Sequence, residues 1–266
     1  MSGPIPLSAL DVALASSLLL LHGLLSAWLG LGLTRRVGVA ALRSVLQLTL
    51  LGYVLAPVLA WEQPLLVFLL GGIMIMIGAR EALGRVSRSH RGLFSSALGA
   101  LALGGITTTI LATTVIVRVQ PWWSPQYLVP LLGMILGNAL TGVGLGLERS
   151  LDQLDTGRVE VELLLARGAT WWEASRPVVA DAIRTGLIPI LNSMSVVGLV
   201  SIPGMMTGQI LGGVDPVLAA RYQIVILFLI AGAIAVSTAT AVLISTSSLF
   251  DAAHRLRIHR LQRKRR

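Results

Sequence analysis

The chain has 266 residues, of which 55% are hydrophobic and 12% are charged, and its formal net charge is +9. Soluble domains carry about one quarter charged residues, so this composition excludes an ordinary soluble protein and indicates an all-α integral membrane protein. The chain contains no cysteine, which excludes disulfide bonds and thiolate metal sites.

Apolar segments that approach the length of a membrane span, about 20 residues, recur along the chain. No Lys or Arg precedes the first of them, so we expect it to be a span and not a cleaved signal peptide. The sequence predicts one transmembrane domain over residues 1–250, followed by a basic tail over residues 251–266. About seven spans are predicted, over residues 8–33, 37–59, 64–79, 95–117, 125–147, 183–200 and 216–248.

The basic residues predict the orientation. With the N-terminus outside, all of the 21 Lys and Arg residues except Arg118 and Arg221 fall on the cytoplasmic side. Because basic residues favour that side, we expect a multi-pass protein of the plasma membrane with a cytoplasmic C-terminus. The charges lie in separate loops without interleaved aromatic residues, so no nucleic-acid partner is expected. The basic tail predicts contact with anionic lipid or with a partner protein.

Glycine and polar residues mark the interior of the fifth and sixth spans. Buried amides and hydroxyls either bond neighbouring helices together or line a translocation route, and the sequence leaves both readings open. Glycines at positions 133, 137, 142 and 146 predict close helix packing along the fifth span. The candidates for the translocation route are Asn138, Thr141, Asn192 and Ser195.

The long predicted cytoplasmic loop, residues 148–184, alternates charged residues with apolar ones at helical spacing. Gly168 is expected to break it into two amphipathic pieces. A short helix beginning near Thr170 would present Trp171, Trp172 and Glu173 to the cytoplasm. Such a segment is either an interfacial anchor or a docking surface for a partner.

Within this loop, Glu162, Gly168 and Val178 follow the spacing of the "EAA" loop of ABC-transporter permeases, with Asp181 where that loop has proline. Over most of its length the chain resembles the FetB-type (YbbM-like) permeases. The resemblance is carried by "RSVLQLTLLGYVL" (43–55), "PLLGMILGNALTGVGL" (130–145), "ARGATWWEA" (166–174) and "VGLVSIPGMMTGQILGGVDPVLAARYQI" (197–224).

The resemblance implies a homodimeric permease that exports iron or another metal species and works with a separate ABC ATPase subunit. Plant members of the family are linked to aluminium tolerance and to a sugar-nucleotide substrate, so a non-metal substrate stays open. The loop residues that would couple the chain to the ATPase are Glu162, Arg167, Gly168, Ala169, Thr170, Trp172 and Glu173.

The chain lacks a phosphate-binding loop, because its single lysine, Lys264, is followed by Arg265 and not by Ser or Thr. We therefore expect a transport subunit that is not an enzyme and binds no cofactor, with ATP bound on the partner. A secondary carrier or channel without an ATPase, and a membrane scaffold, are the alternatives.

The segment of residues 201–216 interrupts the apolar pattern at the predicted outer end. Pro203 and Gly204 are expected to end the sixth span, and Asp215 before Pro216 predicts the start of the last helix. The residues between are too few to cross the membrane. They form either a plain connecting hairpin or an outer gate, whose candidates are Pro203, Gly204, Met205, Met206, Gln209, Gly213 and Asp215.

Overall fold

A computed structural model describes residues 8–263 of the chain, so Lys264 and the two arginines that end the predicted tail lie outside the described residues. The helices are α1 (Ala9–Trp28), α2 (Thr34–Trp61), α3 (Pro64–Gly84), α4 (Leu93–Leu111), α5 (Pro125–Thr156), α6 (Arg158–Ala166), α7 (Trp171–Val196), α8 (Gly204–Leu211) and α9 (Pro216–Ser247). A π-helix η1 (Ala112–Ile116) follows α4, and a short 3-10 helix η2 (Ile258–Arg260) lies in the tail. The strands β1 (Arg88–Ser89) and β2 (Gln262–Arg263) pair antiparallel.

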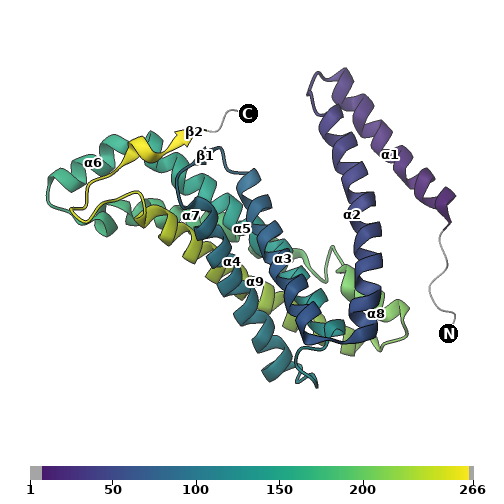
Figure 1. Cartoon of the computed structure of the whole chain (residues 1–266). Helices are drawn as coiled ribbons and strands as arrows, with labels where there is room; N and C mark the ends of the chain where they lie inside the picture. Colours follow the sequence, from purple (N-terminus) through teal and green to yellow (C-terminus); the bar gives the residue numbers. More distant parts are fainter. Residues whose placement is uncertain (1–7, 264–266) are drawn as a thin grey trace.

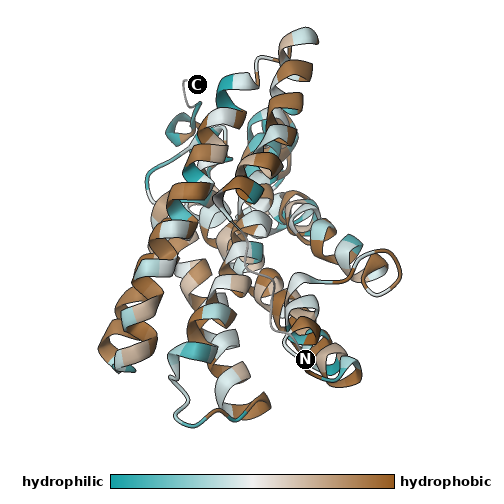
Figure 2. Cartoon of the chain, turned by 90° about the vertical axis from the view of Figure 1, so that its right-hand side faces the viewer, coloured by the Kyte–Doolittle hydropathy of each residue, from teal (hydrophilic) through white to brown (hydrophobic). Residues whose placement is uncertain are grey.

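The predicted all-α membrane fold is confirmed. Within residues 8–263, six helical segments are long and apolar enough to cross a membrane: α1, α2, α3, α4 with η1, α5 and α9. Figure 2 shows hydrophobic residues along the length of these helices. The sixth predicted span, residues 183–200, falls mostly in the second half of α7. The helix α7 is not among these six, since charged residues such as Arg176 and Asp181 lower its hydropathy.

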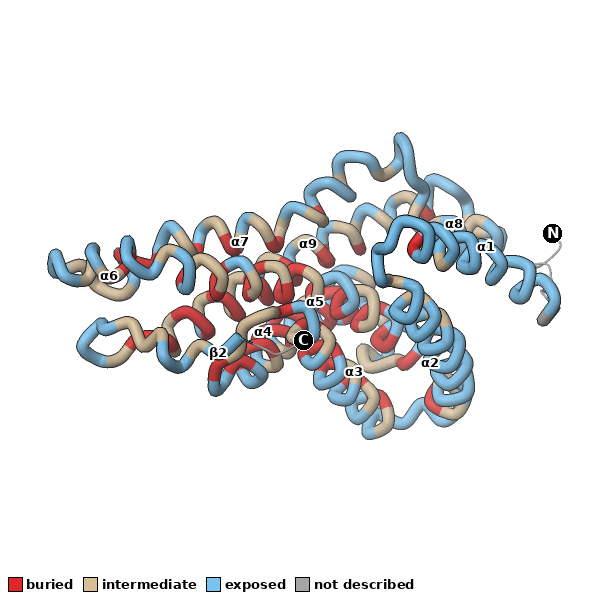
Figure 3. The backbone as a smooth tube through the Cα atoms, turned by 90° about the horizontal axis from the view of Figure 1, so that it is seen from above, coloured by how far each residue is buried: buried red, intermediate tan, exposed pale blue. Residues whose placement is uncertain are grey.

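The body of the molecule is a bundle of α3, α4, α5, α7 and α9, from which α1 and α2 stand apart as a hairpin (Figure 1). We call the end that carries β1, β2 and α6 the basic end, and the end that carries α8 the far end. Most of α1 and α2 is exposed (Figure 3), as expected of helices whose apolar side chains face lipid. Arg43 of α2 forms an ion pair with Glu81 of α3, so the hairpin is tied to the bundle.

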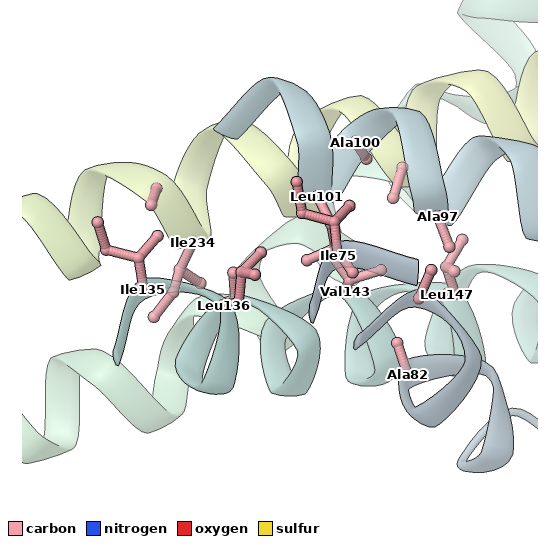
Figure 4. Close-up of a cluster of buried hydrophobic side chains, with 14 of the residues drawn as sticks. Ile75, Ala82, Ala97, Ala100, Leu101, Ile135, Leu136, Val143, Leu147 and Ile234 are labelled. Carbon is pink, nitrogen blue, oxygen red and sulfur yellow. The ribbon is translucent and has the colours of Figure 1, made fainter. Parts of the chain in front are cut away.

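The centre of the bundle is closely packed. Figure 4 shows Leu101 of α4 and Ile75 of α3 in one buried cluster with Ile135 of α5 and Ile234 of α9. In lipid such a core is held by van der Waals contact, because the surrounding hydrocarbon is as apolar as the side chains. The best-packed helix is α5, which contacts α3, α4, α7 and α9.

Three helices approach most closely at Gly142 of α5, Gly186 of α7 and Thr238 of α9. A Cβ atom added to Gly186 would lie 2.6 Å from the Gly142 carbonyl oxygen and 2.6 Å from Thr238 Cγ2. Gly146 is similarly enclosed, since an added Cβ would lie 2.8 Å from Thr238 Cγ2. The predicted packing role is therefore confirmed for Gly142 and Gly146. At Gly133 an added Cβ would lie 3.2 Å from Met74 Cε, and at Gly137 it meets no atom of residues 8–263 within 4 Å, so the packing prediction for Gly137 stays a prediction.

The predicted break at Gly168 is confirmed, because this residue has φ +91° between α6 and α7. The helix after Thr170 is not short, however. It continues for 26 residues, through Pro177 and Pro189, as α7. The continuity follows from tertiary packing, because Ala182 and other small buried residues hold α7 against α5 and α9.

Pro203 and Gly204 do not end the preceding helix. That helix ends at Val196, where Gly198 with φ +82° turns the chain, and Pro203 is the N-cap of α8. Proline suits this position because the first turn of a helix needs no backbone donor there. The prediction for Asp215 is confirmed: its carboxylate accepts hydrogen bonds from the second and third backbone N–H groups of α9, at 3.0 and 3.1 Å.

Candidate functional site

The turn between α6 and α7 projects from the basic end. Gly168 lies in the left-handed region, and Ala169 leads to Thr170, the N-cap of α7. The Thr170 hydroxyl accepts a hydrogen bond from the Glu173 backbone N–H at 3.3 Å, and the Glu173 carboxylate accepts one from the Thr170 N–H at 2.8 Å. This capping box satisfies two backbone donors and gives the exposed turn a fixed shape.

Both predicted coupling carboxylates, Glu162 and Glu173, form hydrogen bonds with residues close to them in the sequence. Glu162 accepts a hydrogen bond from Arg158, one turn earlier on α6, at 2.7 Å. The hydrogen bonds from Thr170 hold the pKa of Glu173 below its usual value. Both side chains therefore shape the turn, and Arg167, which makes no ion pair within residues 8–263, stays free on its surface.

The two tryptophans of the turn have different environments. Trp171 is partly buried, and its ring lies 6.0 Å from that of Phe250, which follows α9. Trp172 is 41% exposed, and Leu163 is 50% exposed. One indole thus fixes the turn to the bundle while the other projects from it, which is the arrangement of a docking surface with a rigid base.

One face of α5 is open, and polar residues occur along it. Its other faces carry buried Leu, Ile and Val, whereas the open face mixes polar residues and glycines with Pro130, Met134 and Leu145. In lipid, polar side chains face the interior of an assembly or a water-filled route. From the far end to the basic end this face carries Gln126, Tyr127, Pro130, Gly133, Met134, Gly137, Asn138, Thr141, Leu145, Glu148 and Arg149.

Asn138 of α5 and Asn192 of α7 lie at the same level on neighbouring antiparallel helices. The register follows from the ion pair of Arg149 with Asp181, 2.6 Å long, at the basic end. Eleven residues separate each asparagine from the ion-pair residue on its own helix, and eleven residues are about three helical turns. Both asparagines are exposed and are turned to the side of their helices that carries the ion pair.

The hydrogen bonds of the four predicted route residues do not tie α5 to α7. The Asn138 amide donates to the Met134 carbonyl oxygen, and the Ser195 hydroxyl donates to Leu191, both on the same helix. Only Thr141 bonds another helix: its hydroxyl accepts from Arg85 Nη1 of the α3 terminus at 3.2 Å. Apart from this bond, no hydrogen bond among residues 8–263 joins the four side chains to another helix.

At the far end, α8 borders a partly open cavity of about 430 Å³ between α5 and α9. Of the predicted gate residues, Met205 and Gln209 line it, together with Met134. The buried Gln209 Oε1 has no hydrogen-bond partner within residues 8–263. The remaining gate candidates lie in or next to α8. Pro203 is its N-cap, and Gly204 and Met206 belong to its first turn. Gly213 and Asp215 lie in the connection from α8 to α9.

Several residues of the site carry no signal in the sequence. Arg85 reaches Thr141 across 56 positions, and the Ser87 backbone N–H donates to the Glu148 carboxylate across 61. Such pairs depend on the fold alone. Arg88, which bonds Asp152 and Asp155 of α5, belongs to the same group. Among residues 8–263, no group of three or more His, Cys, Asp or Glu side chains could hold a metal ion.

Comparison with known proteins places these features in a family. The profile of the uncharacterised protein family UPF0014 matches residues 9–250. A UPF0014 membrane protein of Synechocystis sp. is 43% identical over 205 residues, which cover 76% of this chain and 78% of that protein. No solved structure matches the chain.

Two further relatives have informative names. The probable iron export permease protein FetB of Escherichia coli is 31% identical over 222 residues, 84% of each chain. The protein ALUMINUM SENSITIVE 3 of Arabidopsis thaliana is 35% identical over 217 residues, 82% of this chain and 78% of the relative. The predicted resemblance to the FetB-type permeases and the multi-pass membrane location are confirmed.

Proposed function

Because the chain belongs to the UPF0014 family of membrane proteins, we propose that it is the transmembrane permease subunit of an ABC exporter in the plasma membrane. A separate ATPase subunit supplies the energy, and iron or another metal species is the cargo. The name of the FetB relative supports the permease role and the metal. A non-metal cargo such as a sugar nucleotide is the second candidate, because the site holds no acidic or histidine cluster among its described residues.

The continuity of α7 carries this proposal. A single helix of 26 residues runs from Trp171, in the exposed turn at the basic end, to Val196, four residues beyond Asn192. A helix transmits displacement along its axis because its backbone hydrogen bonds hold the turns together. A partner that moves the α6–α7 turn therefore moves Asn192 relative to α5, without any further connection.

The open polar face supports a homodimer. Asn138 and Asn192 are exposed on the isolated chain, and lipid hydrocarbon is a poor environment for amides. A second copy that covers α5 and α7 would enclose these side chains in a shared route. Their amide oxygens and the hydroxyls of Thr141 and Ser195 are ligands that suit a hard metal ion.

The segment at the far end, residues 203–215, acts as the outer gate of this transport route. The helix α8 is too short to cross the membrane, and Gly213 on its C-terminal side has φ +90°. Displacement of α8 would open the cavity lined by Met134, Met205 and Gln209. The route then runs from Arg85 at the basic end, past the two asparagines, to this cavity.

Copurification with the ATPase tests the proposal. The wild-type chain is coexpressed with candidate ABC ATPase subunits of its own organism, solubilised and purified through a tag on the chain. We expect one ATPase to copurify, and Trp172→Ala with Arg167→Glu to abolish its recovery while the chain itself is recovered in full. The matched control is Ile188→Ala, an exposed position of α7 beyond the turn. Recovery of no ATPase by the wild-type chain would contradict the permease role.

A further inference from the structure

The C-terminal segment was expected to contact anionic lipid or a partner protein, and in the structure residues 249–263 fold back onto the protein. The Arg257 backbone N–H donates to the Leu249 carbonyl oxygen at 2.8 Å, and β2 pairs with β1 in the connection from α3 to α4. Leu256 and Leu261 pack against the hydrophobic core. The described part of the tail is thus a structural element of the basic end (Figure 1).

Asp251 fixes the turn that sends the tail back. Its carboxylate accepts hydrogen bonds from the backbone N–H groups of Ala253 and Arg255, at 2.9 and 2.8 Å. It also forms an ion pair with Arg257 at 3.5 Å. These bonds, the Arg255 amide first, hold the pKa of Asp251 below its usual value. The tail therefore has a defined shape where it leaves α9.

This turn lies directly against the α6–α7 turn. His254 Nδ1 accepts a hydrogen bond from the Trp171 backbone N–H at 3.3 Å, and the rings of Trp171 and Phe250 are in contact. The Trp171 N–H belongs to the first turn of α7, where no carbonyl of the helix can accept it. The tail thus supplies a cap for α7 from a position 83 residues away.

A cavity of about 450 Å³ opens between the two turns. The α6–α7 side contributes Glu162, Leu165, Ala166, Gly168 and Ala169, and the tail contributes Ala253, His254, Arg255 and Leu256. Its walls are largely small and apolar. Glu162 is neutralised by Arg158, whereas Arg255 has no ion-pair partner within residues 8–263 and neither has Arg167 beside the cavity. Asp251, which acts on Arg255, is already paired with Arg257, and the Glu173 carboxylate acts on His254 and offsets one of the two free arginines. The rim therefore has a small excess of positive charge.

We propose that this cavity receives the ATPase subunit, and that the tail forms half of the docking surface. The occupant is an apolar side chain of the ATPase, presented by an acidic patch that faces Arg167 and Arg255. Exposed Trp172 extends the surface on the α7 side. The inference rests on the proposed function, since it assumes an ATPase partner. It adds that residues 253–256, outside the α6–α7 turn, contact this partner.

The test uses the full chain in detergent together with the ATPase that copurifies with it, and measures the dissociation constant by biolayer interferometry. Ala253→Trp fills the cavity, while Ala252→Trp adds the same side chain at the neighbouring exposed position, which does not line the cavity. We expect Ala253→Trp to weaken binding about tenfold or more and Ala252→Trp to leave it within about twofold, as for a central and a peripheral contact.

A second variant tests the charge of the rim without adding a large side chain to the cavity. Arg255→Glu reverses one rim charge, and we expect it to weaken binding and to reduce the dependence of affinity on salt, because a charge pair is screened by ions. Equal affinity of Ala253→Trp and wild type, or an unchanged salt dependence in Arg255→Glu, would overturn the inference. If no ATPase binds the wild-type chain, the proposed function fails instead. Thermal unfolding of each variant shows whether a loss of binding reflects misfolding.

Discussion

Gly186 of α7 packs against the backbone of Gly142 of α5 so closely that a Cβ atom on Gly186 would overlap the Gly142 carbonyl oxygen, and a Cβ atom on Gly142 would overlap α9. An added Cβ on Gly142 would lie 2.6 Å from Ile234 Cγ2 and 3.1 Å from the Gly186 carbonyl oxygen. The contact fixes α7, the proposed lever, against the helix that carries the open polar face.

Replacing Gly186 with alanine should therefore destabilise the protein, by about 1–3 kcal/mol for overpacking of a tight contact. Gly99→Ala on α4 is the matched control, since this glycine is exposed, has open space around it and lies outside the candidate site. Alanine there should stabilise the helix by about 0.5–1 kcal/mol. Thermal unfolding in detergent, followed by circular dichroism, measures both, and equal midpoints for the two variants would refute the packing argument.

The polar face can be probed with single cysteines, because the natural chain has none. Asn138→Cys and Asn192→Cys should react with a membrane-impermeant methanethiosulfonate reagent, since a thiol ionises and reacts in water but not in lipid. Val236→Cys, on an exposed apolar face of α9, should stay unmodified. Reaction is measured by mass spectrometry after labelling in sealed vesicles. Modification of Val236→Cys together with protection of both asparagine positions would place the water-filled route elsewhere.

His90, in the connection between α3 and α4, predicts a pH dependence of stability. Its Nδ1–H donates to the Arg91 carbonyl oxygen at 2.8 Å, so Nε2 accepts from the Ser245 hydroxyl at 2.9 Å. Burial lowers the pKa of His90 from about 6.5. Because the folded state then binds the proton less well than the unfolded state, the neutral ring favours folding above pH 6.5, and this contribution is lost as the pH falls through the lowered pKa.

The thermal unfolding midpoint of the wild-type protein should accordingly be lower at pH 5.5 than at pH 7.5. His90→Gln, whose amide can both donate and accept but does not titrate there, should show a smaller fall. His259→Gln, at an exposed position of the tail, is the control and should behave like the wild type. A wild-type midpoint that is independent of pH over this range would contradict the assignment.

The capping box of α7 predicts a difference between two substitutions of Thr170. Thr170→Ala removes the hydroxyl that accepts from the Glu173 N–H and should cost about 1 kcal/mol at the helix start, whereas Thr170→Ser keeps the cap. Hydrogen exchange of the first turn of α7, measured by mass spectrometry, should be faster only in the alanine variant. ATP hydrolysis by the partner ATPase, stimulated by the chain, should fall in the same variant. Equal exchange in the alanine and serine variants would show that the Thr170 cap does not stabilise the first turn of α7.

The outer segment predicts unequal roles for its glycines. Gly213 has φ +90°, a conformation that other residues rarely adopt, whereas Gly204 has an ordinary helical position with open space around it. Gly213→Ala should therefore impair transport by shifting α8, and Gly204→Ala should not. Efflux from cells that express comparable amounts of each variant measures this, and normal efflux in Gly213→Ala would count against the outer gate.

The sequence predicted what depends on local chemistry. The apolar segments, the turn at Gly168 and the cap at Asp215 with Pro216 follow from length, backbone freedom and hydrogen bonding within a few residues. It failed where tertiary contacts decide. A short helix was expected after Thr170, but the packing of α7 against α5 and α9 continues this helix to Val196.

The candidate site was partly predictable in the same sense. The helical spacing of Asn138 and Thr141 indicated a shared face, but the alignment of Asn138 with Asn192 needed the register that Arg149 and Asp181 set. The contact of His254 with Trp171 joins segments far apart in sequence and leaves no pattern in either. The basic composition of the tail predicted contact with lipid or a partner but not its fold, because a run of basic residues carries no information about the strand that β2 forms.

The central claim is that this chain is a conduit driven from the basic end by another polypeptide. It is tested by reconstitution into liposomes, with radioactive iron measured inside them over time, with and without the copurified ATPase and ATP. We expect uphill accumulation only when the chain, the ATPase and ATP are all present and the basic end faces outward. Uphill accumulation by the chain alone would contradict the claim and favour a secondary carrier.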